Sequence, residues 1–271
     1  MTSTGKIGFI GGGNMAEAFI KGLVAGGIAP GDIIASEPRD DRREWMHQQY
    51  GVSTTSDNGE LVSQCATIVL AIKPQIVKPV LEGVVSEFDH GKLLISILAG
   101  ISTETLEKIL GGKPRIVRAM PNTPALVGAG AAAICPRLHT SQEDLLRAKK
   151  LFEMIGTVVQ VEELQMDAVT GLSGSGPAFV YTFIEALADG GVQEGLRRDV
   201  AQTLAVQTVL GAAMLVKESG EHPALLRDKV CSPAGTTIHA IRVLEERGLR
   251  STIMETVAAA TKRSRELGGK V

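Results

Sequence analysis

The chain has 271 residues, 44% of them hydrophobic and 21% charged, with a formal net charge of −2 at pH 7. This composition is typical of a globular protein with one large or two smaller domains. It argues against a nucleic-acid partner, because the lysines and arginines are dispersed and form no basic stripe. The longest apolar runs, such as 93–99, are too short to span a bilayer, and we expect a cytoplasmic protein without membrane contact. The three cysteines and five histidines show no metal-ligand spacing, so we expect free thiols and no metal.

The first predicted element is a strand, a tight turn and a helix around three consecutive glycines. An apolar run at 7–10 precedes the glycines, and apolar residues recur at helical spacing over 15–24. Gly11, Gly13 and Ala16 fit the pattern G-x-G-x-x-A, whose turn directs backbone N–H groups and a helix N-terminus at a pyrophosphate. An ordinary strand-to-helix turn is the alternative. We predict cofactor contacts at Gly11, Gly12, Gly13, Asn14 and Met15.

The second predicted strand, over 32–36, ends where a dinucleotide-binding fold selects its ribose. Glu37 stands there, and a carboxylate favours the 2'-hydroxyl of NAD. Arg39, with Arg42 and Arg43 a turn later, favours the 2'-phosphate of NADP. The same charges also suit the start of the following helix. The sequence therefore gives a mixed signal at Glu37 and Arg39, both of which we place among the cofactor contacts.

Strands and helices continue to alternate at the spacing of a parallel sheet. Further strands are predicted over 52–54, 67–71, 93–97, 115–120, 129–135 and 156–161, and helices over 76–88, 103–110 and, after a capping box at Ser141, up to 155. Residues just past the carboxyl ends of such strands lie where open α/β sheets bind ligands. We therefore predict cofactor contacts after two of these strands, at Ala71, Lys73, Pro74, Gln75, Ala99 and Gly100.

Near Glu162 the pattern changes and becomes helical. No strand is expected after Asp167, and helical periodicity covers 179–188, 197–217, 238–246 and 251–267. A small helical domain with so many apolar positions is expected to bury part of its surface against a second copy. A self-contained domain that packs only on the first one is the alternative. We place the dinucleotide-binding domain at 1–163 and the helical domain at 164–271.

Two stretches of the second half are not explained by helix packing. Residues 170–179 read TGLSGSGPAF, and glycines before Pro177 weaken a helix without local gain, as functional sites often do. Residues 228–239 read DKVCSPAGTTIH, which places Gly235, Thr236 and Thr237 at a helix start. Their N–H groups are suited to a carboxylate, and a threonine hydroxyl is suited to a ring nitrogen. Capping of the helix by Thr236 alone would explain the second stretch equally well.

With these residues in view, the chain resembles the pyrroline-5-carboxylate reductase family. The resemblance runs nearly end to end and rests on five stretches: IGFIGGGNMAEA at 7–18, AIKPQ at 71–75, RAMPNTPALVGAG at 118–130, DAVTGLSGSGPAF at 167–179 and DKVCSPAGTTIHAI at 228–241. It implies an α/β fold, in which a Rossmann-type domain is followed by an all-helical domain that interlocks with a second subunit. The implied assembly is a homodimer and, beyond it, a decamer made of dimers, with the active site between cofactor cleft and helical domain.

The resemblance also implies an activity and its residues. The reaction would be reduction of 1-pyrroline-5-carboxylate to L-proline by hydride transfer from NADPH, with NADH as the alternative. Thr237 matches the threonine that contacts the substrate's ring nitrogen and is the catalytic candidate. Its carboxylate-holding turn corresponds to Ser232, Gly235 and Thr236, and further cofactor contacts correspond to Asn58, Lys73, Met120, Pro121 and Thr123. Glu37 departs from the neutral residue that many members have at its position.

Three other functions are weighed against this one. A hydroxyacid dehydrogenase of the 6-phosphogluconate type needs a lysine on the inter-domain helix, and residues 167–191 contain neither lysine nor histidine. A non-catalytic nucleotide sensor would not need the motifs at 170–179 and 231–237. A reductase of the six-membered cyclic imine differs by one methylene, which changes binding by only ~1–3 kcal/mol. The sequence does not separate this last function from the five-membered one.

Overall fold

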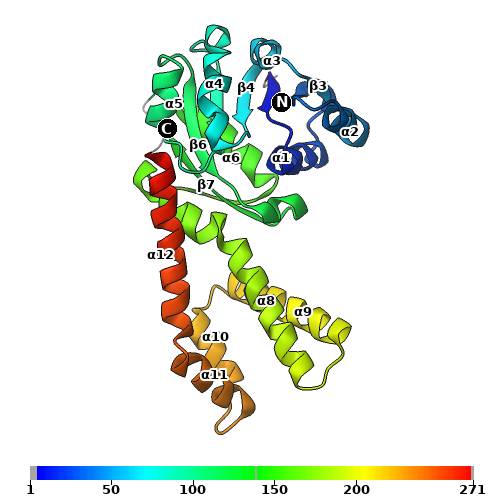
Figure 1. Cartoon of the computed structure of the whole chain (residues 1–271), viewed down its shortest axis with the longest axis vertical. Coiled ribbons are helices and arrows are strands. Elements are labelled where there is room, and N and C mark those ends of the chain that lie inside the picture. The colour runs from blue at the N-terminus through cyan, green and yellow to red at the C-terminus, as the bar shows by residue number, and fades with distance from the viewer. Residues whose placement is uncertain (1–4, 138, 270–271) are drawn as a thin grey trace. The chain divides into compact units, whose positions relative to one another are not determined.

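The computed structural model describes residues 5–137 and 139–269, and the chain divides into two compact units (Figure 1). Unit 1 combines Met1–Ser175 with Ala258–Val271, and unit 2 is Gly176–Val257. The functional boundary predicted between residues 163 and 164 stays a prediction, because compactness alone assigns no function to either side.

Unit 1 is built on a single sheet, in which the described residues form eight strands in the order β3-β2-β1-β4-β5-β6-β7-β8. The pairs are parallel except β6 and β7, which run antiparallel. β7 reverses because only a short 3₁₀ segment, Thr123–Val127, joins it to β6, and a parallel pair needs a longer crossover. The strands are β1 (Lys6–Ile10), β2 (Ile33–Ser36), β3 (Ser53–Thr55), β4 (Cys65–Leu70), β5 (Leu93–Ser96), β6 (Arg115–Met120), β7 (Gly130–Pro136) and β8 (Gly156–Gln160).

Helices cover both faces of this sheet (Figure 1). One core cluster lies under α1 (Asn14–Ala25), α2 (Asp40–Tyr50) and α6 (Gln142–Glu153), where the rings of Phe19 and Phe152 meet edge to face at 4.7 Å. The second cluster lies under α3 (Asn58–Gln64), α4 (Val77–Glu82) and α5 (Thr103–Ile109). Apolar side chains on both faces explain the continuous apolar strands of the sequence. The predicted α/β fold of Rossmann type is thereby confirmed.

The helix predicted over 76–88 is wrong in length. The segment is a 3₁₀ turn (Pro74–Ile76), α4, and a second 3₁₀ turn (Val85–Glu87). Gly83 ends α4, in keeping with the low helix propensity of glycine. The capping box predicted for α6 is confirmed, since Ser141 accepts a bond from the Asp144 N–H and the Asp144 side chain bonds back to Ser141.

The described part of the chain after β8 contains helices and turns but no strand, as predicted. It comprises α7 (Met166–Val169), a π-helical turn (Thr170–Gly174), α8 (Gly176–Gln193), α9 (Arg198–Ser219), α10 (Pro223–Val230), α11 (Thr236–Glu246) and α12 (Leu249–Gly268). The sequence reading missed α10. Its signal was Pro223 at the first helical position, after His222, whose ring nitrogen caps the Ala224 N–H.

Unit 2 buries few large side chains within one chain. Its compact cluster centres on three alanines, Ala188, Ala201 and Ala205, whereas Tyr181, Leu204, Leu210, Leu215 and Met254 are among its exposed apolar side chains. α9 is long and apolar enough to cross a membrane by length and composition alone, and the prediction of no membrane contact stays a prediction. A helical unit with so small a core is expected to bury its apolar surface against another chain.

Candidate functional site

The glycine turn after β1 has the geometry of a phosphate-binding turn. Gly11 has a φ of +103°, and a Cβ built there would lie 2.5 Å from the carbonyl oxygen of Ala71. Gly13 caps α1 in an extended conformation, and a Cβ on it would meet nothing within 4 Å. The first N–H groups of α1 therefore border an open space that a pyrophosphate can approach. These residues fit a dinucleotide.

The other predicted cofactor residues gather at the same edge of the sheet. They follow the carboxyl ends of β2, β3, β4, β5 and β6, which are parallel neighbours of β1 or of one another. The Ala71 N–H donates to the Ile10 carbonyl at 2.8 Å, which extends the β1–β4 pairing into the turn. Asn58 begins α3 and bonds the Ser36 hydroxyl, and Lys73 is exposed. The connections from β1 and β4 leave toward opposite faces, and ligands bind at such a switch point.

Gly100 differs from the other predicted cofactor residues because the end of α12 covers it. It has a φ of +75°, and a Cβ there would lie 3.2 Å from both the Gly268 nitrogen and the Ser264 carbonyl oxygen. Gly100 is buried, whereas the neighbouring Ala99 keeps partial exposure. The structure thus gives Gly100 a packing role against α12 and leaves Ala99 as the more accessible of the two.

The loop after β6 is held by Asn122, which the sequence reading did not single out. Its side-chain oxygen accepts from the Ala131 N–H at 2.8 Å, and its side-chain nitrogen donates to the Ser173 carbonyl at 3.0 Å. Asn122 is buried between Pro121 and Thr123, two of the predicted cofactor residues. A polar residue two positions after a buried strand was the available signal. Asn122 fixes this loop against β7 and the π-helical turn.

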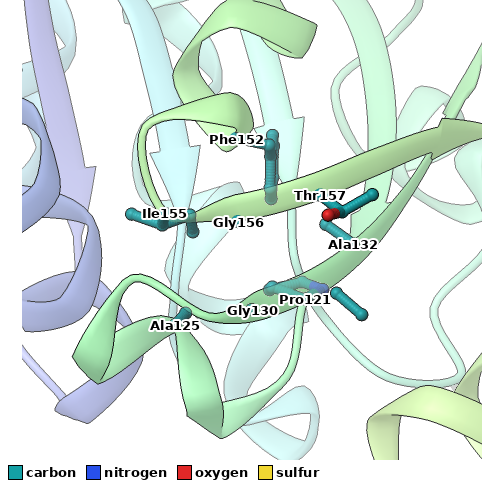
Figure 2. Close-up of a pocket in the computed structure, with 9 residues that line it drawn as sticks. Pro121, Ala125, Gly130, Ala132, Phe152, Ile155, Gly156 and Thr157 are labelled. Carbon is teal, nitrogen blue, oxygen red and sulfur yellow. The ribbon is translucent and has the colours of Figure 1, made fainter. Parts of the chain in front are cut away.

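Behind the same loop lies a small apolar hollow (Figure 2). Pro121 and Ala125 line it from the loop, and Phe152 and Ile155 line it from the end of α6 and the turn that follows. The hollow leaves no room for a water molecule. It is therefore a packing contact that supports the loop, and no ligand site.

The predicted motif at 170–179 comprises the π-helical turn, a bend at Ser175 and the first residues of α8. The Ser175 N–H donates to the Thr170 carbonyl at 2.9 Å, five residues back. A turn of this kind accommodates the Pro177 ring, which cannot donate and crowds the preceding turn. Gly174 is required for contact with Met120, because a Cβ there would lie 2.7 Å from the Met120 methyl carbon. The motif thus supports the predicted nicotinamide loop.

An ionic cluster around the buried side chain of Arg118 was also not predicted. Arg118 on β6 donates to Glu163 at 2.6 Å, and its second nitrogen lies 4.0 Å from Asp167. Thr103 donates to the other Glu163 oxygen at 2.8 Å, and Ser264 of α12 donates to Asp167 at 2.6 Å. Burial acts to raise the pKa of Glu163, but the bonds from Arg118 and Thr103 outweigh it and leave that pKa below its ordinary value.

The three cysteines are free thiols in different surroundings. Burial, with the charge of Glu163 beside it, raises the pKa of the Cys135 thiol to about 12, and burial raises that of Cys65 to about 11. Both are free and buried, and Cys231 is free and partly exposed. Within residues 5–137 and 139–269, no three His, Cys, Asp or Glu side chains are grouped to hold a metal ion.

In unit 2, the predicted substrate turn is a tight connection between α10 and α11. The Gly235 N–H donates to the Ser232 carbonyl at 3.0 Å, and a Cβ on Gly235 would lie 2.2 Å from the Ser232 hydroxyl oxygen. Ala234 has a φ of +56°, which only a constrained turn imposes on alanine. The Gly235 N–H already has the Ser232 carbonyl as its acceptor and is not free for a carboxylate, while the assignment of Gly235 to the substrate turn stays a prediction.

Thr236 and Thr237 keep their predicted place at the helix start. Gly235 is the N-cap of α11, and no side chain caps the helix, so Thr236 does not act as a cap. The N–H groups of the first helical turn lack partners within the helix. Thr237 is partly buried and Thr236 is exposed. The α11 N-terminus can therefore offer backbone donors to an anion and a hydroxyl to a neighbouring polar atom.

Comparison with known proteins identifies relatives over nearly the whole chain. A pyrroline-5-carboxylate reductase of Synechocystis sp. is 50% identical over 268 residues, which cover 98% of this chain and 99% of the relative. The Escherichia coli protein of the same name is 42% identical over 97% of this chain and 98% of its own length. The chain belongs to the pyrroline-5-carboxylate reductase family.

Solved members of this family share the fold. The reductase from Coxiella burnetii superposes with a TM-score of 0.92 at 39% identity and covers 97% of this chain and 98% of its own. The Plasmodium falciparum protein, solved with NADP bound, has a TM-score of 0.90 at 34% identity over 99% and 100% of the two chains. Residues 6–100 match the model of coenzyme F420-dependent NADP oxidoreductases, and 163–267 match that of pyrroline-5-carboxylate reductase dimerisation. The predicted family and two-part fold are confirmed.

Proposed function

We propose that this protein reduces 1-pyrroline-5-carboxylate to L-proline with hydride from NAD(P)H, the last step of proline biosynthesis. The observation that carries the proposal is the 50% identity to a pyrroline-5-carboxylate reductase over 98% of the chain. The NADP bound to the Plasmodium falciparum relative supports the predicted NADPH, with NADH as the alternative. The proposed protein is therefore an oxidoreductase that acts on a cyclic imine.

The cofactor roles fall to unit 1. A bound nicotinamide dinucleotide supplies the hydride, and the chain supplies binding and orientation. The N–H groups after Gly13 would bind the pyrophosphate, and Glu37 with its partner Arg39 would contact the ribose. Asn122 and the π-helical turn hold the loop of Met120 and Thr123, which we assign to the nicotinamide. Lys73 is exposed for a phosphate or carbonyl oxygen.

The substrate roles fall to the turn before α11. The N–H groups of Thr236 and Thr237, with the helix dipole, would bind the substrate carboxylate. The cyclic imine accepts hydride once its nitrogen is protonated, and this cation forms in solution near neutral pH, so no strong side-chain acid is required. The Thr237 hydroxyl would accept a hydrogen bond from that N–H and orient the ring.

Initial rates test the function directly. NADPH and NADH are each mixed with enzyme and 1-pyrroline-5-carboxylate, and the loss of reduced cofactor is followed. Turnover with either supports the proposal, and a matched assay with the six-membered imine ranks the two rings. Binding of cofactor without turnover of either imine would overturn the substrate assignment and favour a nucleotide sensor.

Thr237→Ala is expected to lower kcat/KM for 1-pyrroline-5-carboxylate by about 10- to 100-fold, because a hydrogen bond to a charged group contributes about 1.5–3 kcal/mol. Thr237→Ser keeps the hydroxyl and is the matched control, with a loss expected to stay within about threefold. Steady-state kinetics of both variants measure these changes in kcat/KM. Full kcat/KM in the alanine variant would contradict the assigned role of Thr237.

For the assembly, we propose a homodimer formed through the helical domain at 164–271, and a decamer made of such dimers, in the cytoplasm. The match of 163–267 to a dimerisation model and the exposed apolar side chains of unit 2 support the dimer. Light scattering coupled to size exclusion gives the molar mass. A monomer at micromolar concentration would contradict the dimer, and a dimer alone would contradict the decamer.

A further inference from the structure

The carboxylate of Glu37 is held against the glycine turn. Glu37 directly follows β2, and its side chain is only 11% exposed. One oxygen, Oε2, accepts from the Gly12 N–H at 3.1 Å. The other, Oε1, accepts from the Arg39 N–H at 3.3 Å and from Arg39 Nε at 3.1 Å. A carboxylate offers about four acceptor sites, and residues in the described part of the chain fill three of them, which leaves one for a ribose hydroxyl.

Two of the three nearby arginines are committed to partners within the protein. Arg42 donates to the Gly12 carbonyl at 2.8 Å and to Glu17 at 2.6 Å, and it stacks on Trp45 with 4.3 Å to the ring centre. Arg43 donates to the carbonyls of Glu37 and Pro38 and pairs with Asp40. Their side chains are 15% and 21% exposed, respectively.

Arg39 is the remaining cation, and Glu37 neutralises it. Its side chain is 61% exposed, which leaves it accessible, but its Nε is bonded to the Glu37 carboxylate. A ribose 2'-phosphate carries between one and two negative charges at neutral pH. Placed at the end of β2, it would meet a buried carboxylate and a cation that this carboxylate already pairs. A 2'-hydroxyl would instead donate to the remaining acceptor site of Glu37.

We infer that Glu37 is the residue that sets the choice of dinucleotide in this chain, and that it favours NADH over NADPH. The inference rests on the proposed function only in that the cofactor is a nicotinamide dinucleotide. NADPH remains usable in this scheme, since Arg39 is accessible, and Glu37 changes the ratio of the two affinities. Of the conflicting sequence signals for the cofactor, the carboxylate of Glu37 therefore prevails over the three arginines.

Equilibrium titrations of the full chain with NADH and with NADPH, without imine, test the inference. We expect NADH to bind about tenfold more tightly, a factor that corresponds to 1.4 kcal/mol. Glu37→Ser is expected to bring the ratio of the two dissociation constants to one or reverse it, because NADH loses its acceptor and NADPH loses a repulsion. Adding Arg39→Ala to Glu37→Ser is expected to remove the gain in NADPH affinity, because the released Arg39 would be the group that pairs with the 2'-phosphate.

Glu44→Gln is the matched control, because it removes the same charge from an exposed position of α2. It is expected to leave both dissociation constants unchanged. Glu37→Gln, which keeps the side-chain volume, replaces the serine variant if that one does not fold. Tighter or equal binding of NADPH by the unmodified chain, or an unchanged ratio in the Glu37 variants, overturns the inference. Failure to reduce the imine with the expected affinity ratio intact would overturn the proposed function alone.

Discussion

Gly11→Ala is expected to cost both stability and cofactor binding, whereas Gly13→Ala is expected to cost mainly binding. At Gly11 the φ of +103° and the Ala71 carbonyl, 2.5 Å from the new Cβ, both oppose a side chain. Strain of ~1–2 kcal/mol in the left-handed region adds to ~1–3 kcal/mol for overpacking. The free energy of unfolding should therefore fall by about 3 kcal/mol, as measured by urea denaturation.

Gly13→Ala is the matched comparison because its backbone already suits alanine. Its φ is −73°, and its Cβ would enter open space. Alanine is a poorer N-cap than glycine, so a loss of less than ~1 kcal/mol in stability is expected. The methyl group would occupy the space that a pyrophosphate needs, and the dissociation constant of NADH should rise about tenfold or more. Binding equal to that of the unmodified chain would contradict the assignment of Gly13 to the pyrophosphate.

Arg118→Met is expected to lower the free energy of unfolding by about 3 kcal/mol, because it leaves Glu163 without its cation. This value is the lower end of the range for a broken buried ion pair. We use the lower end because the Glu163 side chain is 33% exposed to solvent. Lys108→Met is the control, because it removes a cation from an exposed pair with Glu104. Its expected effect is below ~0.5 kcal/mol. Equal losses in the two variants would contradict a structural role of the Arg118 cluster.

Acid denaturation gives a second measurement on the same cluster. Because the pKa of Glu163 in the folded chain is lowered below its ordinary value of 4.5, its ionisation stabilises the fold. This contribution is fully present above the unfolded pKa of about 4.5 and is lost as the pH falls through the lower folded value. Glu163→Gln lacks the titrating group, so its stability should fall less steeply below pH 4.5. Parallel curves in this range would contradict the lowered pKa.

The parts of the structure that short stretches determine were predictable, and the parts that distant contacts determine were not. The glycine turn and the Ser141 capping box are set by neighbouring residues, and both were predicted. Arg118 and Glu163 are 45 residues apart in the sequence, and Ser264 and Asp167 are 97 residues apart. No local sequence pattern therefore predicts either contact. The contacts of the arginines near Glu37, at the predicted ribose position, were likewise not predictable from the sequence. Three arginines are visible in the sequence, but only the contacts distinguish exposed Arg39 from the committed pair.

Unit 1 is formed by two separate stretches of the chain, with unit 2 inserted between them. Ser264 and Gly268 of α12 complete it by contacts with Asp167 and Gly100, which precede the insertion. During translation most of the dinucleotide-binding unit therefore emerges first but cannot close this edge until α12 has left the ribosome. Contacts of such long sequence separation slow folding. A chain interrupted anywhere within unit 2 would expose the incomplete edge beside Gly100, which makes it a ready target for proteolysis.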